Sequence, residues 1–101
     1  MRLFVAVFAL LLGAQAANAE NVSIPIKNFD FGPVNVTVAP GTTVVWKNLD
    51  DEPHTVASID GLFHSQALDQ NDSFRFTFEK AGTFRYICSI HPSMKASITV
   101  K

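Results

Sequence analysis

The chain has 101 residues, of which 8 are basic and 9 are acidic, and its formal net charge is −1. This balance leaves no basic patch, so charge gives no reason to expect nucleic acid as a partner. The sequence contains a single cysteine, which excludes an internal disulfide. If the protein is exported to an oxidising compartment, that thiol needs to be buried, catalytic or bound to a metal.

Residues 1–19 carry the pattern of a secretory signal peptide. Arg2 precedes an apolar stretch over residues 3–12, which is too short to span a bilayer because a spanning helix needs about 20 apolar residues. Ala17-Asn18-Ala19 then fits the small-x-small rule for a cleavage site, and Ala14-Gln15-Ala16 also meets it. The alternative, a strand or helix of the domain, would leave a run of apolar residues exposed. We therefore expect a periplasmic protein, exported by a cleaved signal peptide, with no stable membrane insertion.

The remaining residues, 20–101, are expected to form one domain of short strands. Apolar and aromatic runs are separated by turn residues, with no helical period and no internal repeat. The stretch Ser58–Asp72 is polar and loop-like, with one helical turn expected near Gln66–Asp69. This pattern predicts an all-β fold, a Greek-key β-sandwich of about 6–8 strands. The expected strands are Val22–Ile26, Val34–Val38, Thr43–Asn48, Ser73–Phe78, Thr83–Cys88 and Lys95–Val100.

Alternation within the strands also predicts where the cysteine points. Successive side chains of a strand face opposite sides, so Phe84, Tyr86 and Cys88 share one face, and Cys88 ends its strand pointing toward the core. The connection from Cys88 to Met94 has the length of a hairpin loop. The preceding strand places three phenylalanines on one buried face, namely Phe74, Phe76 and Phe78.

Three soft or borderline metal ligands lie at the end of the expected strand Thr83–Cys88 and in the loop after it. The run Cys88-Ser89-Ile90-His91-Pro92-Ser93-Met94 contains a thiolate, an imidazole and a thioether. His54 could complete a set of two histidines, one cysteine and one methionine, which is typical of a blue-copper electron-transfer site. Structural zinc sites use four cysteine or histidine ligands, and magnesium and calcium prefer oxygen.

Taken singly, each of these residues has a simpler interpretation. Cys88 alone would be a small buried hydrophobe and Met94 a core filler, and either histidine could be a turn residue. Their joint occurrence at ligand spacing in a β-rich chain favours copper. By contrast, His64 has no second ligand nearby in the sequence and is expected to be a surface residue.

The run Cys88-x-x-His91-x-x-Met94, together with Pro53-His54-Thr55-Val56, resembles the cupredoxins, and the short ligand loop is most similar to amicyanin and related small plastocyanin-like proteins. The resemblance covers essentially all of residues 20–101. It implies a cupredoxin-type sandwich with one type 1 copper. It also implies that His54, Cys88, His91 and Met94 are the ligands, and that His91 is the surface-facing one through which electrons pass.

The sequence departs from this family pattern beside two ligands. Thr55 follows the first histidine where the larger family often has asparagine, whose side chain normally steadies the loop, although the Thr55 N–H could still donate to the Cys88 sulfur. Ile90 replaces a common proline, and its N–H could also reach that sulfur. Because hydrogen bonds to the thiolate stabilise Cu(I), we expect a higher reduction potential than in an Ile90→Pro variant.

These features predict a soluble, monomeric electron carrier, not an enzyme, whose copper cycles between Cu(I) and Cu(II). Its partners would be redox proteins such as a c-type cytochrome or a periplasmic dehydrogenase or oxidase. They would dock near His91 on a small apolar patch formed with Ile90, Pro92 and Pro53. The acidic run Asp50-Asp51-Glu52 is usually a solvated turn, but it could steer a basic partner, and association would then slow as salt rises.

Three other classes of function fit parts of the sequence. Copper handling, as a chaperone, scavenger or resistance protein, uses the same ligands and is the main alternative. A thiol enzyme would need an exposed Cys88 beside an oriented histidine, whereas alternation points Cys88 inward. A purely structural adhesion domain would leave the ligand loop unexplained.

Overall fold

The computed structural model describes residues 20–101, and the expected signal peptide lies outside these residues. Within this part of the chain there are seven strands and no helix, so no helix is long and apolar enough to cross a membrane. The strands are β1 (Asn21–Ile26), β2 (Asn35–Val38), β3 (Thr42–Asn48), β4 (Ala57–Ser58), β5 (Ser73–Phe78), β6 (Gly82–Ile87) and β7 (Lys95–Val100). The predicted all-β class is confirmed. All six expected strands are present with small shifts at their ends, and only the very short β4 was missed.

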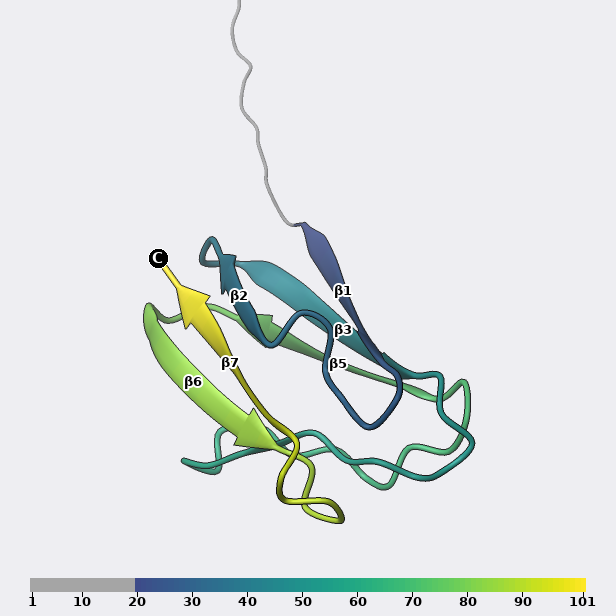
Figure 1. The fold of residues 1–101 in the computed structure, drawn as a ribbon. Coiled ribbons are helices and arrows are strands. Elements are labelled where there is room, and N and C mark those ends of the chain that lie inside the picture. Colours follow the sequence, from purple (N-terminus) through teal and green to yellow (C-terminus); the bar gives the residue numbers. More distant parts are fainter. Residues whose placement is uncertain (1–19) are drawn as a thin grey trace, which may run out of the picture.

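The strands form two sheets packed face to face, as Figure 1 shows. One sheet has the order β1-β3-β5 and the other the order β2-β7-β6-β4. The pairs β1–β3 and β2–β7 are parallel, while β3–β5, β6–β7 and β4–β6 are antiparallel. Because β1, β2 and β3 alternate between the sheets, the chain crosses the sandwich repeatedly, as in Greek-key sandwiches.

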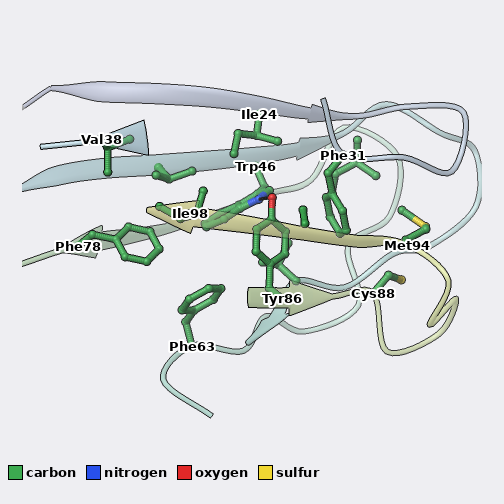
Figure 2. Packing of buried hydrophobic residues seen from close by; sticks show 14 of the residues in the cluster. Ile24, Phe31, Val38, Trp46, Phe63, Phe78, Tyr86, Cys88, Met94 and Ile98 are labelled. Atoms are coloured by element: carbon green, nitrogen blue, oxygen red, sulfur yellow. Dashed lines mark hydrogen bonds between the residues drawn. The ribbon is translucent and has the colours of Figure 1, made fainter. Parts of the chain in front are cut away.

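Side chains from the inner faces of both sheets fill the space between them (Figure 2). Trp46 of β3 and Tyr86 of β6 are both fully buried, and the Trp46 indole N–H donates a hydrogen bond of 3.1 Å to the Tyr86 hydroxyl. This bond joins one sheet to the other and satisfies both polar groups, which would otherwise be costly to bury. Other buried members of this core are Ile24, Phe31, Val44, Phe63, Phe78, Ile98 and Val100.

The three phenylalanines of β5 lie on one face as predicted, but only Phe78 is fully buried. Phe74 and Phe76 are half-buried and pack against the margin of the core. The reason is that β5 is an edge strand of its sheet, so the opposite sheet covers its inner face only in part.

The helical turn predicted near Gln66–Asp69 is absent from the described chain, and the segment is extended instead. Leu68 forms an isolated bridge with His54, in which the His54 N–H donates to the Leu68 carbonyl at 3.1 Å and the Leu68 N–H donates to the His54 carbonyl at 2.7 Å. Leu68 and Ser65 are buried, so the segment packs as a strand-like strip rather than a solvated turn. This strip fixes the backbone of His54.

Candidate metal centre

Two loops at one end of the sandwich bring three potential ligand atoms together. His54 lies between β3 and β4, Cys88 directly follows β6, and His91 lies in the loop from β6 to β7. The Cys88 Sγ is 3.7 Å from Nδ1 of His54 and 3.8 Å from Nδ1 of His91, and the three ligand atoms lie within 4.8 Å of one another.

This spacing fits one metal ion held by all three atoms. Bonds of about 2.0 Å to nitrogen and 2.3 Å to sulfur, separated by a trigonal angle of about 120°, place the two donor atoms about 3.7 Å apart. A thiolate with two imidazoles in a trigonal arrangement, completed by a weak axial methionine, is the ligand set of type 1 copper. The donor chemistry and the geometry therefore fit one type 1 copper.

The ligand loop is folded so that Met94 returns to the cysteine. The Cys88 N–H donates to the Met94 carbonyl at 3.1 Å, the His91 N–H to the Cys88 carbonyl at 3.2 Å, and the Met94 N–H to the His91 carbonyl at 2.9 Å. Met94 is almost completely buried, and Figure 2 shows its side chain at the same end of the core as Cys88. The fourth predicted ligand thus lies at the same end of the core as Cys88.

Asp50 orients the ring of His54. The His54 side chain is fully buried, and its Nε2 lies 2.8 Å from Oδ2 of Asp50. An ionised carboxylate only accepts hydrogen bonds, so Nε2 carries the proton, and in the neutral ring Nδ1 keeps a free lone pair on the side of Cys88. Partial burial opposes ionisation of Asp50, but donation from Phe29, His54 and Asn28 outweighs it and lowers the pKa of this carboxyl.

The surroundings of Cys88 favour the thiolate that a metal requires. Burial alone would raise the pKa of its thiol, but the Thr55 N–H, together with contacts from His54 and His91, outweighs burial and lowers it to about 6. The side chain is fully buried, as strand alternation predicts. An attacking thiol needs access to its substrate, so this burial argues against a thiol enzyme.

Thr55 connects the two ligand loops. Its N–H donates to the Cys88 sulfur at 3.3 Å, which confirms the prediction. Its hydroxyl accepts a bond of 2.7 Å from the Ser89 N–H and lies 2.8 Å from the Ser89 hydroxyl. The threonine hydroxyl therefore links the loops here, at the position where the larger family often has asparagine.

The role predicted for the Ile90 N–H is not supported. Among the described residues, the N–H and the hydroxyl of Thr55 donate to the Cys88 sulfur, Nδ1 of each histidine lies within 3.8 Å of it, and no contact comes from Ile90. The loop is closed beside the cysteine by the His91 N–H, which donates to the Cys88 carbonyl. The higher potential predicted relative to Ile90→Pro therefore loses its structural basis.

Two residues near the centre were not recognised from the sequence. Phe29 packs its ring against both His54 and His91, although it lies in the distant connection after β1. In the sequence Asp50 stands out only as part of an acidic run, and no local motif links either residue to the ligands. His64 is exposed, as predicted, and does not belong to the group of ligand atoms.

Residues 1–100 match the family model of the cupredoxin-like domain. The chain is therefore a cupredoxin, as its ligand loop and its sandwich indicate.

Among known proteins, the chain is similar to amicyanin from Paracoccus versutus, with 30% identity over 88 residues that cover 82% of this chain and 67% of that protein. It is also similar to plastocyanin from Scenedesmus fuscus, with 33% identity over 84 residues that cover 70% of this chain and 86% of that protein. Both relatives align with most of the chain.

Solved structures show the same fold. A purple cupredoxin from Nitrosopumilus maritimus superposes with a TM-score of 0.75 and 34% identity, covering 79% of this chain and 99% of that one. A copper-containing nitrite reductase from Thermus scotoductus gives a TM-score of 0.77 and 31% identity over 91% of this chain, but the match covers only 25% of the reductase. The shared part is a single sandwich, so the reductase activity does not transfer to this chain.

Proposed function

We propose that this protein is a single-electron carrier with one type 1 copper bound by His54, Cys88, His91 and Met94. The observation that carries the proposal is the triangle of ligand atoms, with the Cys88 sulfur 3.7 Å and 3.8 Å from the two histidine Nδ1 atoms. Asp50 orients the His54 ring with Nδ1 toward Cys88, and the Thr55 N–H stabilises the Cys88 thiolate, so two of the three groups are already prepared for the ion. Similarity to amicyanin and plastocyanin supports a carrier rather than an enzyme.

Bound copper would supply one-electron chemistry through Cu(I) and Cu(II). The protein supplies a rigid ligand frame, since Asp50 fixes the His54 ring and Thr55 fixes the cysteine loop. A frame that does not move between the two oxidation states lets an electron enter and leave with little reorganisation. His91 is the ligand that is partly exposed, so it provides the route to the surface.

Partners and location extend this proposal. Redox proteins such as a c-type cytochrome or a periplasmic dehydrogenase or oxidase would dock around His91. Ile90 and Pro92 flank His91 in the sequence, and Pro53 precedes His54, whose ring centroid lies 5.0 Å from that of His91; all three are exposed, and Ile90 is 46% exposed. A small apolar contact suits a carrier that must dissociate quickly. We further propose that residues 1–19 direct export to the periplasm and that the carrier acts as a soluble monomer.

The visible spectrum of the protein with Cu(II) tests the copper site. We expect an intense thiolate-to-copper charge-transfer band that is lost in Cys88→Ser and changed in His54→Gln. The exposed His64 offers a matched control, because His64→Gln removes a histidine outside the ligand group and should keep the band. A band that survives in Cys88→Ser would contradict the proposed site.

Electron exchange tests the carrier role. The reduced protein should transfer its electron rapidly and reversibly to a cytochrome c in a stopped-flow experiment. Transfer of copper to a copper-free acceptor protein without such exchange would instead support the main alternative, a copper chaperone or scavenger.

A further inference from the structure

The connection after β1 makes an unusual corner next to the metal centre. Asn28 and Phe29 are consecutive non-glycine residues in the left-handed region, with φ of 56° and 58°. Positive φ is rare for a bulky side chain such as phenylalanine. The corner is closed by two backbone bonds, in which the Lys27 N–H donates to the Asp30 carbonyl at 3.0 Å and the Asp30 N–H donates to the Lys27 carbonyl at 3.1 Å.

One carboxylate holds this Asn28–Phe29 corner in place. Oδ1 of Asp50 accepts from the Asn28 N–H at 2.7 Å, and Oδ2 accepts from the Phe29 N–H at 2.9 Å. Successive backbone N–H groups in such a conformation form a small concave anion-binding site. Here the anion is the Asp50 side chain of the same protein. The Asp50 backbone is held in turn, because its N–H donates to the Asn48 side-chain oxygen at 2.9 Å.

The same carboxylate also contacts the metal centre. Oδ2 of Asp50, which accepts from Phe29, lies 2.8 Å from Nε2 of His54. Asp50 thus joins a predicted copper ligand to the backbone that carries Phe29. Its side chain is only 11% exposed, so water competes little for these bonds.

The corner places the Phe29 ring against both histidines. Its centroid lies 5.1 Å from that of His54 and 4.9 Å from that of His91, each at an interplanar angle of 89°. These are edge-to-face contacts of the kind that stabilise aromatic pairs. Phe29 is also 46% exposed. Phe29 therefore contacts the rings of both histidines and also faces solvent, so it covers that side of the centre.

We propose that Asp50 is a positioning residue that holds Phe29 as a cover over His54 and His91, and that this cover limits access of solvent and chelators to the metal. The inference rests on the proposed copper function. The apolar shell of a metal site controls its exposure to solvent, and groups around the ligands strongly affect metal retention. The left-handed corner is the conformation that brings the ring over both histidines, which explains why a costly backbone geometry is kept here.

The first test asks whether Asp50 positions the ring. In the copper-free protein, nuclear Overhauser contacts between the Phe29 and His91 ring protons should be present, and they should be lost in Asp50→Asn, because an amide offers one oxygen to three donors. Asp60→Asn is the matched control, since Asp60 also accepts a backbone N–H, from Leu62. Contacts retained in Asp50→Asn would overturn the positioning role.

The second test asks whether the ring protects the metal. Release of Cu(I) to a chelator should be about 10-fold faster in Phe29→Ala and about 10- to 100-fold faster in Asp50→Asn. Ile59→Ala is the matched control, because Ile59 is an apolar side chain that is 66% exposed and borders Thr83 and Arg85 instead of the ligands. Release from Phe29→Ala as slow as from Ile59→Ala would overturn the cover, even if Asp50→Asn fails to fold.

The double variant tests the link between the two residues. If Asp50 acts partly through Phe29, release from Asp50→Asn/Phe29→Ala should be slower than the product of the two single effects. Fully multiplicative effects would overturn this link. The copper-free contacts do not depend on copper binding, so a protein that shows them but gives no charge-transfer band would contradict the proposed function and leave the positioning role of Asp50 intact.

Discussion

At the scale of single residues, Thr55 shows how one side chain divides its hydrogen bonds. Its hydroxyl is 2.8 Å from the Ser89 hydroxyl but 3.9 Å from the Cys88 sulfur, while its N–H is 3.3 Å from that sulfur. The shorter contact is the stronger one, so the hydroxyl mainly holds the loop. The backbone N–H mainly tunes the thiolate.

This division predicts the effect of removing the hydroxyl alone. Thr55→Val should lower the free energy of unfolding by about 1 kcal/mol, because Ser89 loses its partner, but should shift the reduction potential little, because the N–H remains. Urea denaturation, followed by the fluorescence of Trp46, the only tryptophan, measures the free energy of unfolding. Thr55→Ser keeps the hydroxyl and should behave like the native protein. An equal loss in Thr55→Ser would point to packing instead.

Tyr86, the only tyrosine, predicts an alkaline limit to stability. Burial raises the pKa of its hydroxyl to about 12 against the opposing effect of the Trp46 hydrogen bond. A folded-state pKa above the unfolded value of 10.0 means that the neutral form stabilises the fold, and this contribution is lost as pH rises from about 10 to about 12. The loss should total roughly 2–3 kcal/mol.

The Tyr86→Phe variant isolates the contribution of the Tyr86 hydroxyl. Lysines also titrate at alkaline pH, but they do so in both proteins and cancel in the difference. The difference in unfolding free energy between the native protein and Tyr86→Phe should be constant below pH 10 and should shrink above it. Phenolate absorbance in the folded protein should titrate near pH 12 and near pH 10 in denaturant. A midpoint near 10 in both states would show that the hydroxyl is accessible.

At the scale of elements, the sequence predicted the strands well because their residues alternate with period two. In β5 and β6 the alternation is strict, so both the strands and their inner faces follow from it. β4 has only two residues, too few to show a period. The strip around Leu68 was misread because its polar composition suggested a turn, whereas its conformation is set by the bridge to His54.

The candidate site was likewise predictable where its residues are close in sequence, and not where they are distant. The spacing of Cys88, His91 and Met94 within one loop points to three of the four proposed ligands, since that information is local. The contacts of Asp50 and Phe29 depend on a backbone corner more than 20 residues before Asp50. Such contacts exist only once the sandwich has folded, so no local pattern could reveal them.

The turn between β2 and β3 gives a prediction at this scale. Gly41 has φ of +93°, and its N–H donates to the Phe78 carbonyl at the end of β5. No atom would lie within 4 Å of an added Cβ, so the cost of Gly41→Ala comes from the backbone alone. We expect a loss of about 1–2 kcal/mol in denaturant unfolding.

Gly41→Asn provides the matched variant, because asparagine tolerates the left-handed region better than alanine and should cost less. The visible spectrum with copper should stay the same in both variants, since the turn lies at the opposite end of β3 from His54. A larger loss in Gly41→Asn than in Gly41→Ala would show that side-chain size, not φ, limits this position.

At the scale of the whole molecule, the proposed metal centre joins the two sheets. His54 follows β3 of the three-stranded sheet, while Cys88, His91 and Met94 lie between β6 and β7 of the four-stranded sheet. An ion bound by all four would connect both layers at one end of the sandwich. A domain of this size buries a modest share of its surface, so such a connection should matter for its stability.

Removing copper should therefore lower the melting temperature. A ligand that binds only the folded state at 1,000 times its dissociation constant adds about 4 kcal/mol, which corresponds to a shift of about 15–30 °C in a small domain. Calorimetry with and without copper should show this shift in the native protein and in His64→Gln, but not in Cys88→Ser, where the thiolate is missing. If Cys88→Ser gained the same stability from copper, the ion would be bound elsewhere on the chain, and the triangle of His54, Cys88 and His91 would not be the site that joins the sheets.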